Sequence, residues 1–278
     1  MASLHNRRHS TNGAMSWKPF TFHTEVSGNG QGLKMVTVHD IGLDPRRNFG
    51  EFFDGRFGSC FKSAYVILNV WITTRDDGTP QDSYRTAEEL CNAIGSLLRI
   101  YDETYVGVGY GFGAHLLSMM AVRDPKRFRA LVLFNHPFRD ISPVNGSLIT
   151  TLGLLRARKR FEIVTAGLLD YHDMPREGYA NVGYARMFKE SEVTKLEGII
   201  QACVNRPEVD PNLILCPILY IVGEDSLYVD NSRRMFDARK MRDHDYILEV
   251  PCCNVPLFED PHVVMNAMLT FLRFLYPK

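Results

Sequence analysis

The sequence predicts an α/β fold, with a mostly parallel central sheet, helices on both of its faces and a long helical insertion. Short apolar runs of strand length, such as "AYVILNV" at residues 64–70, alternate along the chain with amphipathic segments of helical length. Runs that are apolar throughout are typical of parallel strands buried on both faces. The alternation stops near residue 137 and resumes near residue 213, which indicates the insertion.

The first half of the chain supplies five predicted strands and two helices. The strands are expected at residues 20–26, 33–40, 64–70, 104–109 and 130–135. The first helix is expected within residues 84–102, where Thr86 and Glu89 form a capping-box pattern. The second helix begins at Gly113 and ends before Pro125, because proline cannot continue a helix.

The second half repeats the pattern after the insertion. Strands are expected at residues 217–223 and 246–250, and helices at residues 231–241 and 262–275. Residues 137–212 are too many for a bare loop in a compact domain, and their helical-looking stretches predict an inserted helical lid. The predicted core therefore comprises residues 20–136 and 213–278, and residues 1–19 are expected to form a loose tail.

Composition excludes several functional classes. The chain has 32 basic and 32 acidic residues, so it lacks the basic stripe expected of a nucleic-acid-binding protein. Its six cysteines are scattered without a C-x-x-C pair, which favours reduced thiols over a disulfide framework or a zinc site. No signal peptide or membrane span is predicted, and the expected location is the cytoplasm. No cofactor is predicted.

The stretch "VGVGYGFGAHLL" carries the main functional signal. A strand, a glycine turn and a helix meet there, as they do at the G-x-S-x-G nucleophile elbow of α/β hydrolases. Gly111 stands at the place of the nucleophilic serine, so the turn is kept and the attacking oxygen is missing. The stretch also fits the dinucleotide pattern G-x-G-x-x-A, but the next strand ends in Asn135 and His136, without the required acid.

The other two catalytic loops of such a fold show matching losses. In "YIVGEDSLYVD" the acid is expected three residues after Gly223, where Ser226 stands, and Asp225 comes one residue early. In "VPCCNVPLFEDP" Asn254 stands where the histidine is expected, and asparagine cannot act as a general base. Losing the serine or the histidine alone costs roughly 10⁶-fold in rate. The sequence therefore predicts an α/β-hydrolase-like protein without a working triad and without enzymatic activity.

Five segments in the same order resemble the N-myc downstream-regulated family. They are "VTVHDIGLD", "VGVGYGFGAHLL", "VLFN", "CPILYIVGEDSLYVD" and "CCNVPLFEDP". The resemblance spans Thr21 to Tyr276 and is weakest in the lid. It implies an α/β-hydrolase fold without a triad. It also implies a cytoplasmic protein that acts in stress, differentiation and trafficking signals through protein partners, in some members at membranes.

A residual pocket next to the elbow is the first alternative left open. His39 and Asp40 lie in the loop that supplies one oxyanion amide in hydrolases, and the Phe112 amide would supply the other. Either these groups form an anion or carbonyl pocket, or Asp40 only bonds to its own backbone in a turn. A small-molecule receptor would need a cavity of about 300 Å³ or more, lined by His39, Tyr110 and Phe112.

The candidate residues for a rescue of catalysis are better explained by structure. His115 is expected to pack as a helix residue and not to act as a displaced base. Cys252 and Cys253 are expected to be structural thiols, because no activating base or cation is identified. Ser118 and Ser226 lack a histidine at a supporting position.

Two charged segments in the predicted lid complete the candidates. A weak contact with anionic lipid is the alternative to a solvated helix face for the basic segment Arg156, Arg158, Lys159 and Arg160. The cluster of Asp170, His172 and Asp173 lacks the spacing of a metal cage and is expected to be a solvated loop.

Overall fold

The structure is a computed structural model of the 278-residue chain. It describes residues 20–29, 33–40, 45–56, 58–74, 86–100, 103–137, 199, 202–203, 205–226, 228–240, 243–251 and 255–275. The predicted tail, residues 1–19, and most of the predicted lid, residues 138–198, lie outside the described residues. The domain boundaries given above therefore stay predictions.

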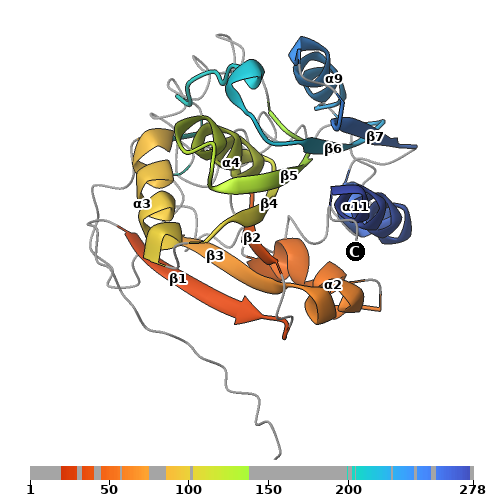
Figure 1. Ribbon diagram of the computed structural model, residues 1–278, viewed down its shortest axis with the longest axis horizontal. Helices are drawn as coiled ribbons and strands as arrows, with labels where there is room; N and C mark the ends of the chain where they lie inside the picture. The colour runs from red at the N-terminus through yellow and green to blue at the C-terminus, as the bar shows by residue number, and fades with distance from the viewer. Residues whose placement is uncertain are drawn as a thin grey trace, which may run out of the picture.

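A seven-stranded sheet forms the centre of the protein, in the order β1-β3-β2-β4-β5-β6-β7 (Figure 1). All neighbouring strands run parallel except β1, which is antiparallel to β3. The strands are β1 (Phe20–Ser27), β2 (Lys34–Val38), β3 (Val66–Thr74), β4 (Tyr105–Tyr110), β5 (Phe128–Phe134), β6 (Ile218–Gly223) and β7 (Tyr246–Val250). The predicted α/β class with a mostly parallel sheet is confirmed.

Helices cover both faces of this sheet, and each face has its own apolar core. One layer consists of α3 (Ala87–Ile100), α4 (Phe112–Arg123) and α9 (Val229–Ala238). The opposite layer consists of α1 (Glu51–Asp54), α2 (Ser59–Ala64), α10 (Pro256–Glu259) and α11 (Pro261–Leu275) (Figure 1). Since both faces are covered, the inner strands can be apolar throughout, as the sequence indicated.

Strand β4 lies at the middle of the sheet and all six of its residues are buried. Its side chains alternate between the faces, and Val106, Val108 and Tyr110 belong to the core on the α11 side. Gly107 and Gly109 therefore face α4, which packs directly against this strand. The carboxyl end of β4 meets those of β2, β5, β6 and β7 at one edge of the sheet, where ligand sites of such folds lie.

The predicted elements have the right type but bounds that differ by a few residues. The Thr86 hydroxyl accepts a hydrogen bond from the Glu89 amide at 3.2 Å, so the first half of the predicted capping box is present. The sequence did not predict the π-helical turn at Arg46–Gly50, nor α1 and α2, which follow it. Each of these segments is too short to show a helical period.

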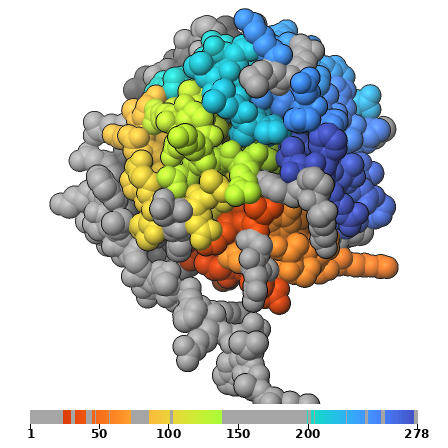
Figure 2. Space-filling model, viewed as in Figure 1, coloured from red at the N-terminus to blue at the C-terminus, as the bar shows by residue number. Residues whose placement is uncertain are grey.

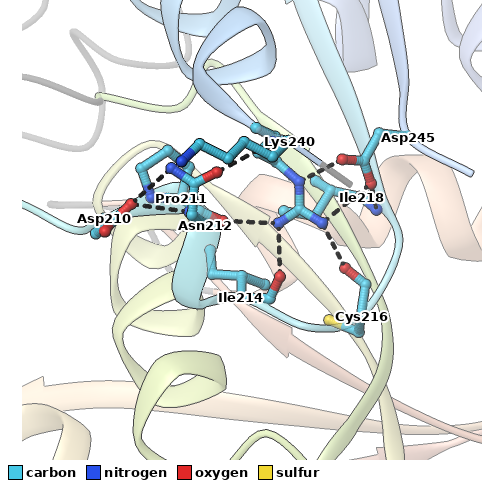
Figure 3. Close-up of polar contacts among 9 residues, drawn as sticks. Asp210, Pro211, Asn212, Ile214, Cys216, Ile218, Lys240 and Asp245 are labelled. Carbon is cyan, nitrogen blue, oxygen red and sulfur yellow. Dashed lines mark hydrogen bonds and ion pairs between the residues drawn. The ribbon is translucent and has the colours of Figure 1, made fainter. Parts of the chain in front are cut away.

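A buried ion pair fixes the loop that leads into β6 (Figure 3). The Arg239 guanidinium binds both carboxylate oxygens of Asp245, and its remaining N–H groups donate to three backbone carbonyls, those of Pro211, Ile214 and Cys216. Asp245 also accepts from the Ile218 amide at 2.9 Å. Burial raises the pKa of Asp245, while Arg239 and this amide act in the opposite direction. All five guanidinium N–H groups are satisfied.

Candidate active-site remnant at the glycine elbow

The junction between β4 and α4 is a sharp turn at Gly111. Its backbone has φ 52° and ψ −120°, a conformation that residues with a Cβ rarely adopt. The Gly111 amide donates to the Phe134 carbonyl at 2.9 Å, and the His115 amide donates to the Gly111 carbonyl at 3.2 Å. The turn is thus anchored to β5 on one side and to the first turn of α4 on the other.

The carboxylate of Asp40 occupies the space in which an elbow side chain would project. A Cβ atom added to Gly111 would overlap the carboxyl carbon and both carboxyl oxygens of Asp40. The Phe112 amide donates to Asp40 Oδ1 at 2.8 Å. The amide expected to bind an anionic or carbonyl ligand therefore already holds an anion of the chain itself. This differs from both sequence alternatives, since Asp40 Oδ1 itself binds the Phe112 amide of another element and does not bond only within its own turn.

Two buried side chains hold the Asp40 backbone in place. Asn48 Oδ1 accepts from the Asp40 amide at 2.9 Å. His39 Nε2 accepts from the Ile72 amide at 3.0 Å, so the ring proton lies on Nδ1 and donates to the Asp40 carbonyl at 2.7 Å. The side chains of His39 and Asp40 are each 4% exposed and Asn48 is fully buried. These bonds fix the Asp40 backbone, although Asn48 Nδ2 has no hydrogen-bond partner among the described residues.

Tyr110 marks the point where the strand ends converge. Its ring stacks on Phe134 with centroids 5.7 Å apart, and its hydroxyl accepts from Asn135 Nδ2 at 3.0 Å. Burial is the main cause that raises the pKa of Tyr110 well above its usual value, followed by the charges of Asp40 and Glu259. Loops that follow β2, β5 and β7 therefore all approach this phenol.

The receptor hypothesis finds no support at the elbow. The three side chains predicted to line its cavity, His39, Tyr110 and Phe112, are all buried, with 2–4% of their surface exposed. The volume directly next to Gly111 contains the Asp40 carboxylate.

Ser226 lies in the turn after β6, as its place in the sequence predicted. Its amide donates to the Gly223 carbonyl at 3.0 Å, and its hydroxyl accepts from the Tyr228 amide at 3.3 Å. Asp225 is exposed to solvent. The buried residue at this loop is thus the serine, which supplies a turn hydrogen bond and no negative charge.

Asn254 lies outside the described residues, together with Cys252 and Cys253. The distances from Gly111 and Ser226 to Asn254 are therefore untested. The described part of the same loop begins at Val255, whose amide donates to Glu259 Oε1 at 2.7 Å. This bond caps the short helix α10.

A buried Ser–His pair lies under the elbow, and the sequence did not reveal it. Ser118 Oγ is 2.9 Å from His136 Nε2, so the expectation that Ser118 has no supporting histidine was wrong. The partners come from α4 and the segment after β5, and only the sheet order brings those elements together. The hydroxyl also donates to the Ala114 carbonyl at 3.0 Å, which leaves His136 Nε2 as the donor to Ser118. A histidine in that role cannot take the serine proton.

The charge state of this cluster is set by burial. Burial, with the nearby Arg206 cation, lowers the pKa of His136 to about 3. Burial also lowers the pKa of His115, whose ring lies 5.9 Å from that of His136. Among the described residues neither nitrogen of His115 has a hydrogen-bond partner, although the carbonyls of Pro137 and Pro207 act to raise its pKa. Both histidines are neutral at physiological pH.

Arg206 joins the two ends of the predicted insertion. Its guanidinium donates to the Cys203 carbonyl at 2.7 Å and to the Pro137 carbonyl at 3.5 Å. The basic segment Arg156, Arg158, Lys159 and Arg160 and the cluster Asp170, His172 and Asp173 lie outside the described residues.

No group of three or more His, Cys, Asp or Glu side chains in the ranges given above is arranged to hold a metal ion. In those ranges, no helix has both the length and the apolar character that a membrane crossing requires.

Known proteins match this chain in sequence and in fold. A family model described as the Ndr family matches residues 21–275. Protein NDRG3 of Xenopus tropicalis is 24% identical over 226 residues, which cover 75% of this chain and 58% of that protein. An NDRG-like protein of Dictyostelium discoideum is 23% identical over 262 residues, which cover 88% of this chain and 80% of that protein.

The solved structures that match are similar in fold. The crystal structure of a hydrolase from Pseudomonas aeruginosa has a TM-score of 0.73 and 15% identity, and the match covers 91% of this chain and 94% of that one. An enol-lactonase from Burkholderia xenovorans has a TM-score of 0.71 at 15% identity, covering 91% and 96% of the two chains. At these identities the likeness shows the α/β-hydrolase fold alone.

Proposed function

Because the chain belongs to the Ndr family, we propose that it is a non-enzymatic protein that acts in the cytoplasm by binding other proteins. In this role it serves as an adaptor in stress, differentiation or trafficking signalling, as the resemblance to the N-myc downstream-regulated proteins implies. The chain spans 58% of the length of the NDRG3 relative described above, so the proposal concerns the hydrolase-like part of such proteins.

The observation that carries the proposal is the Asp40 carboxylate above Gly111. A serine hydrolase needs a nucleophile at the elbow and a free amide that stabilises the oxyanion. Here the elbow residue has no side chain, and the Phe112 amide is bound to Asp40 Oδ1 at 2.8 Å. The nucleophile and the free oxyanion amide are thus both missing at the elbow, which supports a role without acyl-transfer chemistry.

The buried Ser118–His136 pair offers no replacement. Both side chains are fully buried, and the hydroxyl proton is directed to the Ala114 carbonyl. With a pKa of about 3, His136 is also a weak base. The pair is best explained as a satisfied polar contact between α4 and the segment after β5.

A hydrolysis assay on the purified chain tests the proposal. We expect the rate with p-nitrophenyl acetate and p-nitrophenyl butyrate to equal the buffer rate for the natural chain and for two variants, Ser118→Ala and Asp40→Asn. Turnover that exceeds the buffer rate and is lost in either variant would contradict the proposal, because it would assign the chemistry to a residue of this site.

A further inference from the structure

Among the described residues, no strand pairs with the outer edge of β7. Strand β7 pairs with β6 in parallel, from Leu219 opposite Tyr246 to Gly223 opposite Val250, and it is the last strand in the sheet order (Figure 1). The outer side of an edge strand presents backbone N–H and C=O groups that another strand can pair with.

This edge lacks the charges that usually protect such a strand. Glu249 is the only charged residue of β7, and Arg233 of α9 binds it through both carboxylate oxygens, with Nε 2.6 Å from Oε1. The neighbouring Ile247 and Leu248 are apolar and only half-buried. Natural edges are commonly blunted by free lysines or inward-pointing charges. Here the single charge is neutralised within the chain.

An exposed aromatic patch adjoins the edge and consists of His244, Tyr246 and Phe274. The ring of Phe274 lies 5.2 Å from that of His244 and 6.3 Å from that of Tyr246. Tyr246 is 43% exposed and Phe274 is 54% exposed. Figure 2 shows the dark-blue surface of the C-terminal residues on the right of the view, next to the lighter-blue surface of the segments that precede them. Exposed aromatic side chains are enriched at protein interfaces.

We propose that β7 pairs antiparallel with β7 of a second copy of this chain, around a two-fold axis at Leu248. In this register Tyr246 faces the second copy's Val250, and Ile247 faces its Glu249. A register centred on Glu249 would instead place two carboxylates directly opposite, which is unfavourable. The self-complementary register keeps both Arg233–Glu249 pairs intact and covers apolar side chains on both copies.

A two-fold contact of this kind uses the same surface on both partners and closes without further growth. The paired strands would extend the sheet across the dimer, and the aromatic patch would lie at its border. The inference goes beyond the proposed function and does not depend on it, since an enzyme with this edge would dimerise equally well.

Sedimentation and light scattering over a range of concentrations test the dimer. The contact is short, so we expect a dissociation constant in the micromolar range, with dimer predominating at about 100 µM. The substitution Tyr246→Lys should raise that constant by about tenfold or more, because it adds a charge to the edge and removes an aromatic contact. The matched control is Ile100→Lys, at an apolar residue that is 59% exposed at the end of α3, a helix that lies away from β7 (Figure 1), and it should leave the constant unchanged.

Two further variants keep the test decisive. If Tyr246→Lys fails to fold by circular dichroism, Phe274→Lys at the end of α11 replaces it. Under mild oxidation Leu248→Cys should form a disulfide-linked dimer, because the two copies of this residue face each other. Ile247→Cys should not form this disulfide. In the proposed register residue 247 lies opposite residue 249 of the second copy, so the two cysteines would be diagonal neighbours and too far apart to bond.

Three results would overturn the proposal. The first is a chain that stays monomeric at about 100 µM. This result would overturn the proposal even if the β7 edge were found to bind a strand of another protein. The second is a dimer that Tyr246→Lys and Phe274→Lys leave unchanged. The third is a dimer that Ile100→Lys weakens as much as Tyr246→Lys does.

Discussion

The contact between Asp40 and Gly111 makes a quantitative prediction about stability. Replacing Gly111 by alanine adds only a Cβ atom, but that atom collides with the Asp40 carboxylate. Two costs follow. A residue with a Cβ held at φ 52° costs about 1–3 kcal/mol in backbone strain. Displacing Asp40 from the Phe112 amide removes a hydrogen bond to a charged group, which contributes about 1.5–3 kcal/mol.

The Gly111→Ala variant should therefore lose about 2.5–6 kcal/mol of unfolding free energy. In an Asp40→Ala background only the backbone strain remains, so the same change should cost about 1–3 kcal/mol. The two substitutions should thus be coupled by roughly 2 kcal/mol. Urea unfolding of the four proteins in this cycle, followed by circular dichroism, measures the coupling.

The control uses another glycine of the same chain. Nothing lies within 4 Å of a Cβ atom added to Gly95, in helix α3. Gly95→Ala should stabilise the protein by about 0.5–1 kcal/mol, and it should add to Asp40→Ala without coupling. If Gly111→Ala and Asp40→Ala are additive within about 0.5 kcal/mol, the carboxylate does not occupy the elbow and the reasoning is refuted. The same contact implies that Gly111→Ser alone cannot restore a nucleophile, because Asp40 must be removed as well.

Two other predictions concern buried ionisable side chains. Arg239→Met should cost about 3–5 kcal/mol of unfolding free energy in urea melts, because it leaves Asp245 buried and unpaired; a loss below about 1 kcal/mol would contradict the role given to the pair. The unfolded chain takes up a proton at His136 near its usual pKa of 6.5, whereas the folded chain does so only near pH 3, so stability should fall as pH falls through this window. His136→Gln should reduce that dependence by about 1.4 kcal/mol per pH unit between pH 6 and pH 4, and an unchanged slope would show that His136 is already protonated in the fold.

Local patterns were sufficient to predict the main elements. Apolar runs identified the buried strands, and the glycine turn between β4 and α4 was predicted at Gly111, where the structure has a positive φ. The short segments between β2 and β3 were missed because four to six residues carry no helical period. The Ser118–His136 contact was missed because neither residue has an unusual neighbour in the sequence.

The sequence by itself determined the alternation of strands and helices, the glycine at the elbow and the serine after β6, since each depends on neighbours along the chain. Only the tertiary structure decided what stands above that glycine. Asp40 and Phe112 are 72 residues apart, and they meet because β2 lies beside β4 although β3 comes between them in the chain. Strand order is set by the packing of whole layers, so no local pattern states it. For the same reason the position of β7 at the end of the described sheet is known only from the assembled structure.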